Sequence, residues 1–229
     1  MNERRGFSGP KEPASGQDGA ADHSEVSPPG YCENVLASAS KGRTQRRKTS
    51  RYISGRQAMN LIEALDFADA IGCPLNFSVD ISWVFFCGSV DDRTRFARWQ
   101  QRLSKWTSRR GFPLTMIWTR EVGERGGVHT HVLLYVPPWL MESGDFQRDF
   151  RRALVRAFEP EGGPHDAARA LNIQSAYSPD GKLRYNLKGI DPKHAEKLGV
   201  HASDQDQGDL DGKRVGCTQN INARARKRL

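Results

Sequence analysis

The stretch LTMIWTREVGERGGVHTHVLLYV, residues 114–136, indicates most clearly how the chain folds. Its two halves, LTMIWTREV and VHTHVLLYV, are rich in β-branched and aromatic residues, which are typical of strands. Between them, GERGG at 123–127 supplies the glycines that suit a hairpin turn. We therefore expect two antiparallel strands, 114–122 and 128–136, to lie side by side.

Further strands and helices surround this hairpin. Amphipathic spacing and capping residues predict helices, whereas β-rich runs predict strands. The expected helices are residues 56–71, a helix that begins at Asp91 or Asp92, residues 145–158, and residues 182–198 with a break at Asp191 and Pro192; the expected strands are residues 75–86 and 171–177. Because strands and helices mix without strict alternation, we expect an α+β fold with an antiparallel central sheet and flanking helices.

The two ends of the chain differ in composition from its middle. Residues 1–56 are first rich in Gly, Pro, Ser, Ala and Asp and then end in the run KGRTQRRKTSRYISGR, which predicts a disordered, basic-ended tail. We expect one folded domain over residues 57–212 and a basic C-terminal segment over residues 213–229. Each basic run is either a solvated charged segment or a surface that contacts nucleic-acid phosphates.

Composition and charge exclude several classes of protein. The 229 residues include 35 Lys and Arg against 27 Asp and Glu, and this formal net charge of +8 favours a polyanionic partner such as nucleic acid. No apolar run approaches the roughly 18 residues of a membrane span, and the N-terminus lacks the apolar core of a signal peptide. The four cysteines have no CxxC spacing, so we expect reduced thiols in a cytoplasm rather than a zinc ribbon or a disulfide scaffold.

His129 and His131 are the first pair of residues that predicts chemistry. Residues i and i+2 of a strand project from the same face, so the two imidazoles lie side by side. Glu121, on the preceding antiparallel strand, lies roughly opposite and can complete a two-histidine, one-acid site for a divalent cation. Glu124 is the alternative acid, because the length of the turn decides the register. The competing interpretation is that both histidines are structural and bind no metal.

Tyr185 and Lys188 form a second candidate pair. They are three residues apart in a predicted helix, so they share a face. Free tyrosine is a poor nucleophile, with a pKa near 10, but a neighbouring cation or a metal-polarised phosphate makes its attack feasible. The alternative is a half-buried tyrosine beside a surface lysine. We expect Tyr177 to pack within its strand, which leaves a single candidate nucleophile.

Together, the H-x-H strand and the helical Y-x-x-K that follows it in a basic domain resemble the HUH endonuclease superfamily. The segment EVGERGGVHTHVLLYV looks most like the replication-initiator (Rep) branch, and the resemblance covers about residues 75–190. One departure is Thr130, where the family usually has a bulky hydrophobic residue. Since threonine is β-branched, it still suits a strand.

The resemblance implies a specific activity. Such enzymes nick one DNA strand at a defined site, because a tyrosine attacks the scissile phosphate and forms a 5′-phosphotyrosine link. The free 3′-hydroxyl then primes rolling-circle replication of a plasmid or phage-like element. The implied nucleophile is Tyr185 with Lys188 assisting at the phosphate, and the implied ligands of Mg²⁺ or Mn²⁺ are His129, His131 and Glu121.

The expected partner is single-stranded or supercoiled origin DNA. No GxxxxGK[ST] motif occurs, so a host helicase is expected to unwind the duplex. The candidate nucleic-acid contacts are Arg47, Lys48, Arg184, Lys213, Arg214, Arg224 and Arg226. The lack of a targeting signal and of a helicase domain favours a bacterial cytoplasm.

Three alternatives remain open at this point. A single-tyrosine transposase or a mobilisation relaxase would use the same nicking chemistry on another DNA target. A non-catalytic basic nucleic-acid-binding module would keep the histidines for structure. A metal-dependent hydrolase would use water directly as the nucleophile.

Overall fold

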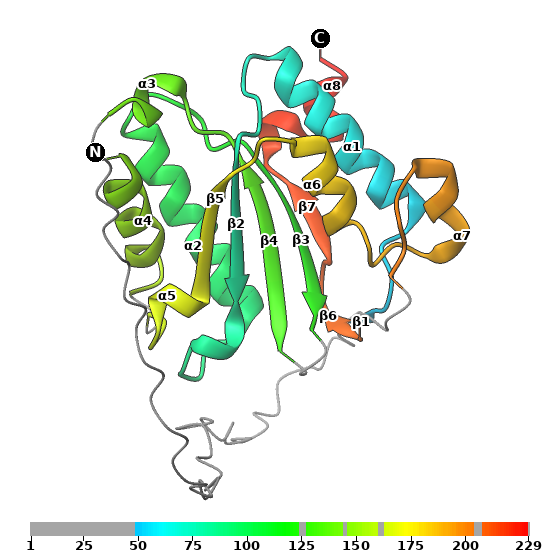
Figure 1. The fold of residues 1–229 in the computed structure, drawn as a ribbon, viewed down its shortest axis with the longest axis horizontal. Coiled ribbons are helices and arrows are strands. Elements are labelled where there is room, and N and C mark those ends of the chain that lie inside the picture. Colours follow the sequence, from blue (N-terminus) through cyan, green and yellow to red (C-terminus); the bar gives the residue numbers. More distant parts are fainter. Residues whose placement is uncertain (1–48, 124–126, 144–145, 160–162, 204–207, 229) are drawn as a thin grey trace, which may run out of the picture. The chain divides into compact units, whose positions relative to one another are not determined.

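The computed structural model describes residues 49–228 except 124–126, 144–145, 160–162 and 204–207, and its elements follow one another as shown in Figure 1. The strands are β1 (Thr49–Ser50), β2 (Phe77–Ser82), β3 (Met116–Val122), β4 (Val128–Leu134), β5 (Leu171–Ser175), β6 (Leu210–Asp211) and β7 (Val215–Cys217). The α-helices are α1 (Gly55–Ala70), α2 (Asp92–Ser108), α3 (Pro138–Met141), α4 (Phe146–Arg156), α5 (Ala167–Ala170), α6 (Pro179–Asn186), α7 (Pro192–Ala195) and α8 (Ala223–Arg226). Within this described part, no helix is both long enough and apolar enough to cross a membrane.

An antiparallel five-stranded sheet in the order β5-β2-β4-β3-β7 forms the centre of the domain. The expected hairpin is present as β3 and β4, with Glu121 opposite His129 and Thr119 opposite His131. On the other side of β4, β2 places Asp80 opposite His131. The expected α+β fold with an antiparallel sheet and flanking helices is therefore confirmed.

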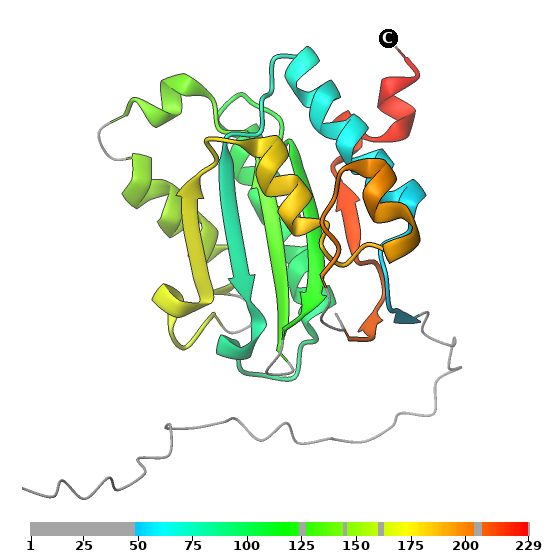
Figure 2. The ribbon, with the colours of Figure 1, turned by 45° about the vertical axis from the view of Figure 1, so that its right-hand side comes forward.

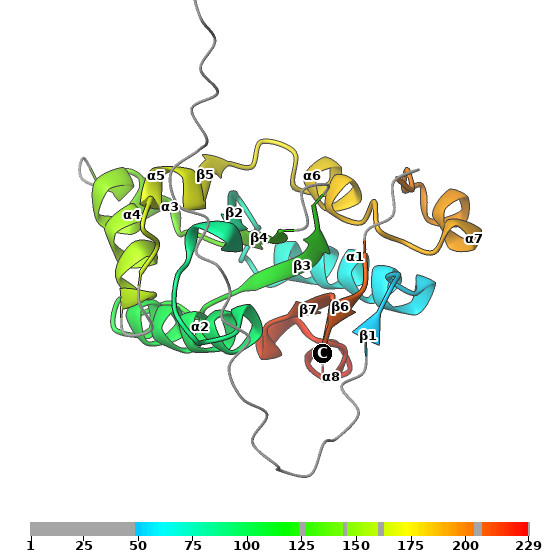
Figure 3. The ribbon, with the colours of Figure 1, turned by 90° about the horizontal axis from the view of Figure 1, so that it is seen from below.

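Helices cover both faces of this sheet, as Figure 3 shows from below. Alternating apolar side chains such as Phe77 and Val132 form one core together with α2 and α4. Side chains of the opposite alternation, such as Ile117 and Leu133, form a second core with α1 and α6. In Figure 2, α6 crosses the upper part of this second face, and the β2 and β4 ends nearest the β3–β4 turn extend beyond it.

The N-terminal boundary of the folded domain lies earlier than expected. β1 pairs antiparallel with β6, and Ile53 is 2% exposed in the second core. Ser54 then caps α1, because its hydroxyl oxygen accepts a hydrogen bond from the backbone N–H of Gln57. Residues 49–56 therefore belong to the domain, and their assignment to a tail is wrong. Burial of Ile53 in the core holds this segment on the domain although the residues around it are basic. Residues 1–48 of the predicted tail lie outside the described residues.

The C-terminal boundary also needs a correction. β7 pairs with β3 as an edge strand of the central sheet, and Ile221 is fully buried in the second core. Residues 213–229 therefore do not form a separate segment. The basic composition of this stretch gave no indication of the short strand β7, which forms by pairing with the edge of β3.

Thr130 is explained by its neighbour in the core. Its side chain is fully buried on the α2 and α4 side, and its Oγ1 accepts a 2.8 Å hydrogen bond from Nε1 of Trp83. Trp83 opens the short 3-10 turn Trp83–Phe85 that follows β2, so the strand expected over residues 75–86 ends early. A buried indole N–H needs an acceptor, and the hydroxyl of Thr130 supplies one that an apolar side chain could not.

Candidate active site

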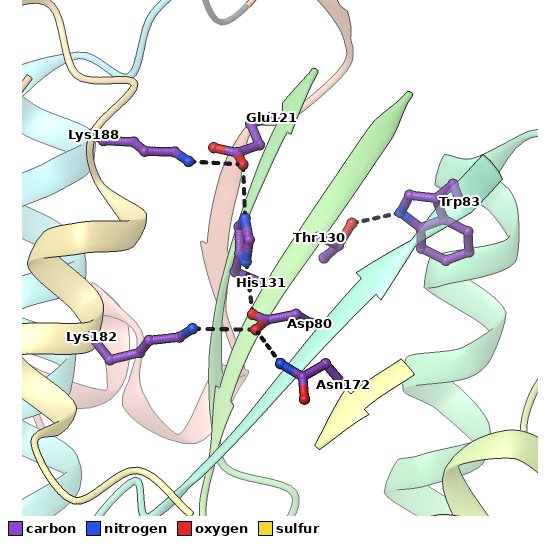
Figure 4. A network of polar contacts seen from close by, with 8 residues as sticks. All are labelled: Asp80, Trp83, Glu121, Thr130, His131, Asn172, Lys182 and Lys188. Atoms are coloured by element: carbon purple, nitrogen blue, oxygen red, sulfur yellow. Dashed lines mark hydrogen bonds and ion pairs between the residues drawn. The ribbon is translucent and has the colours of Figure 1, made fainter. Parts of the chain in front are cut away.

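The candidate site is a cluster of charged side chains on the α6 side of the sheet, shown in Figure 4. Strand alternation and register place Asp80 of β2, Glu121 of β3 and His131 of β4 on this one face. Lys182 of α6 and Lys188, two residues beyond the end of that helix, complete the cluster. It therefore combines three neighbouring strands with one helix and the turn that follows it.

His131 lies at the centre of the cluster. Its Nδ1 is 2.7 Å from Oδ1 of Asp80, and its Nε2 is 3.0 Å from Oε1 of Glu121. Burial by itself lowers the pKa of His131, but its hydrogen bonds with both carboxylates and their attraction outweigh that effect and raise the pKa. Both ring nitrogens are thus held by acids, and the ring orientation is fixed.

The two lysines hold these carboxylates from the other side. Nζ of Lys182 lies 3.2 Å from Oδ2 of Asp80, and Nζ of Lys188 lies 3.1 Å from Oε1 of Glu121. Burial tends to raise the pKa of each carboxyl group, but His131 and the nearby lysine outweigh it and lower both values. Both acids are therefore ionised near neutral pH, and they tie α6 and its C-terminal turn to the sheet.

Tyr185 projects from α6 between the two lysines. Its ring centre is 4.9 Å from Nζ of Lys188 and 5.8 Å from Nζ of Lys182, and the residue is 57% exposed. Burial tends to lower the pKa of Lys188, but Glu121 and Tyr185 outweigh it and raise the pKa. The structure therefore brings Tyr185, the charged Lys188 and Glu121 together, and it leaves the tyrosine accessible.

His129 is also on this face, opposite Glu121 in the hairpin register. Its ring lies against the backbone of Gly123: a Cβ atom at that position would be 2.9 Å from Nε2 of His129. Burial, and then repulsion from His131, lower the pKa of His129. His129 is therefore neutral at pH 7, which is the form of imidazole that binds metals.

The donor set suits a divalent cation in type and in one separation. The 3.0 Å between Nε2 of His131 and Oε1 of Glu121 equals that of adjacent ligands at about 2.1 Å around an octahedral ion. A carboxylate such as Asp80 on the second nitrogen is the usual support of a metal-binding histidine.

Among the described residues, no three His, Cys, Asp or Glu side chains are arranged so as to hold a metal ion. Mg²⁺ needs few protein ligands because it keeps several waters, so metal binding stays a prediction that two positioned donors support. The alternative ligand Glu124 lies outside the described residues.

Asp80 and Lys182 belong to the cluster although we did not predict them. Asp80 is a charged residue in the middle of the strand FSVDIS, where a charge is costly unless it has a partner. Lys182 precedes Tyr185 by one helical turn, as Lys188 follows it. The charged residue within a strand and the spacing of Lys182 from Tyr185 were both visible in the sequence. The contact itself could not be predicted, because His131, the partner of Asp80, lies on a strand 51 residues away.

Tyr177 does not pack within a strand. β5 ends at Ser175, and Tyr177 is 97% exposed, so the prediction of a packing role is wrong. The chain leaves the sheet here to reach Pro179 at the start of α6, and a proline cannot donate a ladder hydrogen bond.

Arg214 is buried and does not reach the surface as a phosphate contact would. It is 1% exposed, its Nε donates a 2.9 Å hydrogen bond to the carbonyl of Ser50, and its Nη2 donates to the carbonyl of Gly208. The guanidinium therefore joins the β1 strand to the segment before β6. These hydrogen bonds correct the prediction that Arg214 binds nucleic acid.

The other predicted nucleic-acid contacts differ in their surroundings. Arg184 donates to the Asp180 carboxylate and to the Leu198 carbonyl, and Arg226 donates to Asn60 and Glu63. These two side chains stabilise the fold through helix and loop contacts. Two further predicted contacts, Lys213 and Arg224, lie on the surface. The last two, Arg47 and Lys48, lie outside the described residues.

Part of the chain is similar to a known protein family. Residues 88–187 match the model of a family described as Replication-associated protein ORF2. The matched stretch contains Glu121, His129, His131 and Tyr185, and it ends directly before Lys188. No curated protein was found that matches this sequence. The part of the chain that forms most of the charged cluster is thus similar to replication-associated proteins.

Proposed function

We propose that this protein initiates rolling-circle replication of a plasmid or phage-like element by nicking single-stranded DNA at a defined site. The observation that carries the proposal is the placement of Tyr185: it is exposed, it lies between two lysines, and its helix is tied to the Glu121 and His131 cluster. The similarity of residues 88–187 to replication-associated proteins supports this function over transposition or mobilisation, which share the chemistry.

In the proposed reaction, the phenol oxygen of Tyr185 attacks the scissile phosphorus. The phenol releases its proton to solvent as a bond forms between its oxygen and phosphorus. The bond from phosphorus to the 3′-oxygen breaks, and that oxygen takes up a proton from solvent to become a 3′-hydroxyl. The charged Lys188, whose Nζ lies 4.9 Å from the ring centre of Tyr185, faces the negative charge that develops on the phosphate. Since the phosphodiester is conserved as a phosphotyrosine, the strand can be rejoined without ATP.

The remaining residues of the cluster hold this machinery in place. We infer that Glu121, His131 and His129 bind Mg²⁺ or Mn²⁺, which supplies Lewis-acid polarisation of the phosphate. Asp80 orients His131 through Nδ1, and Lys182 fixes Asp80. We expect the substrate to be single-stranded or supercoiled origin DNA in a bacterial cytoplasm, and a host helicase to open the duplex.

The decisive experiment compares two exposed tyrosines, one within α6 and one just before it. Wild type, Tyr185→Phe and the matched control Tyr177→Phe are incubated with Mn²⁺ and a labelled single-stranded oligonucleotide from the origin of the protein's own replicon. We expect a covalent protein–DNA adduct on a denaturing gel for wild type and Tyr177→Phe, a loss of at least about 1000-fold in Tyr185→Phe, and no adduct in EDTA.

Two results would contradict the proposal. Cleavage that survives Tyr185→Phe without an adduct would show that water is the nucleophile, as in a metal-dependent hydrolase. DNA binding without cleavage by the wild type would instead identify a non-catalytic nucleic-acid-binding module.

A further inference from the structure

A basic cleft of about 450 Å³ lies between α2 and α4, which pack on the sheet face opposite the candidate active site. Figures 1 and 3 show these two helices side by side on their own layer, away from α6. The lining contains one acid, Asp149, against six cations: Arg102, Lys105, Arg109, Arg110, Arg152 and Arg156. The proposed nicking reaction uses none of these side chains.

Helical spacing concentrates this charge. Arg102, Lys105 and Arg109 are three and four residues apart along α2 and its C-terminal cap, and Arg152 and Arg156 are four apart on α4. Like charges at these spacings repel each other, so the arrangement costs stability rather than adding to it.

Nearby acids do not offset this repulsion. Lys105, Arg109, Arg152 and Arg156 are exposed, and none of them forms an ion pair with a carboxylate of the described part of the chain. Asp149 contacts Arg148, which is outside the cleft lining. A site that accumulates uncompensated cations is suited to a polyanion.

The lining indicates which polyanion fits. The guanidinium of Arg110 lies 3.9 Å over the ring of Trp106, so this aromatic face is covered and offers no stacking platform for unpaired bases. The described lining includes no Asn or Gln that would read base edges, and its cations suit phosphate oxygens. We propose that this cleft binds the phosphate backbone of duplex DNA without regard to sequence.

The cleft is a second DNA site and is separated from Tyr185 by the central sheet. In the context of the proposed function, it would hold the duplex that flanks the nicked strand while the strand itself lies at α6. Duplex binding does not depend on the nicking reaction, so the two proposals can fail separately.

The test neutralises three exposed cations of the cleft in the full chain. The cleft variant carries Lys105→Gln, Arg109→Gln and Arg152→Gln. Arg102 and Arg110 stay, because Arg102 donates to the carbonyl of Ala157 and Arg110 covers Trp106. The matched control removes the same charge from exposed positions elsewhere: Arg56→Gln, Lys197→Gln and Lys227→Gln.

Binding is measured by fluorescence anisotropy with a labelled duplex of arbitrary sequence at several salt concentrations. We expect the cleft variant to bind at least about tenfold more weakly in low salt, and the slope of log affinity against log salt to fall by about 2.7, or about 0.9 for each cation that no longer pairs with a phosphate. The control variant should keep the wild-type slope. Adduct formation on the short single-stranded oligonucleotide should be unchanged in both.

Each other outcome overturns the proposal. Equal losses in the cleft and control variants would indicate a general effect of net charge. Unchanged affinity in the cleft variant would show that duplex DNA binds elsewhere, and an equal loss for single-stranded DNA would exclude a duplex site. A charge-conserving variant, Arg109→Lys with Arg152→Lys, should bind like wild type; if it does not, packing rather than charge explains the loss. If the wild type forms no adduct but the duplex result holds, the nicking proposal fails and the cleft proposal stands.

Discussion

His131 shows how single residues determine the electrostatics of the site. Its two nitrogens contact Asp80 and Glu121, and each of these acids contacts one of the two lysines that flank Tyr185. Charges at these depths are tolerated when every partner is present, whereas removal of one partner leaves the others uncompensated and destabilises the protein. Substitutions within this cluster therefore affect both stability and activity, and the readouts below separate the two effects.

At this scale, Asp80→Asn tests the support that Asp80 gives to His131, the proposed metal ligand. The amide keeps the shape but loses the charge that attracts His131 and Lys182, so we expect Mn²⁺ affinity and the adduct rate to fall by about 10- to 100-fold. Isothermal calorimetry of Mn²⁺ binding and the Mn²⁺ dependence of adduct formation measure this. The control is Asp180→Asn, an exposed acid on α6 that pairs with Arg184. Equal Mn²⁺ affinity in wild type and Asp80→Asn would contradict a positioning role.

The raised pKa of His131 predicts a pH-dependent stability in EDTA. A histidine whose pKa is raised on folding stabilises the protein fully below the unfolded value of about 6.5, and this contribution is lost as the pH rises through the folded value. Urea unfolding of His131→Gln should therefore show a deficit of about 3 kcal/mol at pH 6 that shrinks at pH 9. Both pH values lie above the lowered pKa values of Asp80 and Glu121, so those acids stay ionised throughout. The control, exposed His201→Gln, should show no such change; an equal deficit at both pH values would contradict the assignment.

The β3–β4 hairpin is the element that aligns the site. Its register places Glu121 opposite His129, and Gly123 closes the strand ends through a 2.7 Å hydrogen bond from its N–H to the carbonyl of Gly127. The ring of His129 occupies the space that a side chain at position 123 would need. Glycine is therefore required here by a close approach of a side chain and not by an unusual backbone angle.

Gly123→Ala tests this close approach. The added Cβ would lie 2.9 Å from Nε2 of His129, so the imidazole has to move, and we expect the adduct rate to fall at least about tenfold. Histidine NMR signals should show a changed environment for His129, whereas the melting temperature should change little. Gly163→Ala is the control, because its nearest heavy atom would be 4.0 Å away. A normal adduct rate in Gly123→Ala would show that the position of His129 is unimportant.

At the scale of the whole molecule, the central sheet separates two cores, and it also separates the charged cluster from the basic cleft. The core with α1 and α6 supports the charged cluster, and the core with α2 and α4 supports the cleft. Segments near both ends of the described part complete the core with α1 and α6: Ile53 lies near its start and Ile221 near its end. The stability of the side that carries the charged cluster therefore depends on residues near both ends of the described part of the chain.

Ile53→Ala tests this dependence in the full chain. Ile53 is 2% exposed, so truncation should lower the free energy of unfolding by about 2–4 kcal/mol, as measured by urea denaturation. Tyr52→Ala, at a neighbouring position that is 43% exposed, should cost much less. A negligible effect of Ile53→Ala would mean that residues 49–56 behave as the tail that their composition suggests.

The sequence by itself determined the local parts of this protein. Runs of β-branched and aromatic residues identified β3 and β4, the glycines located their turn, and a three-residue spacing placed Lys188 close to Tyr185. These features depend on residues close in the chain, whose geometry is set by backbone periodicity. The hairpin also brings Glu121 close to His131, so this part of the site is local as well.

The tertiary structure alone decided which distant residues meet. The pairing of β2 with β4 brings Asp80 to His131, and β7 forms by pairing with the edge of β3. Arg214 is buried by this packing and therefore has a structural role instead of the predicted surface role. The packing of α2 against α4 likewise creates the basic cleft. The periodicity of the sequence does not predict these contacts, because each of them depends on which apolar faces pack together when the two cores form.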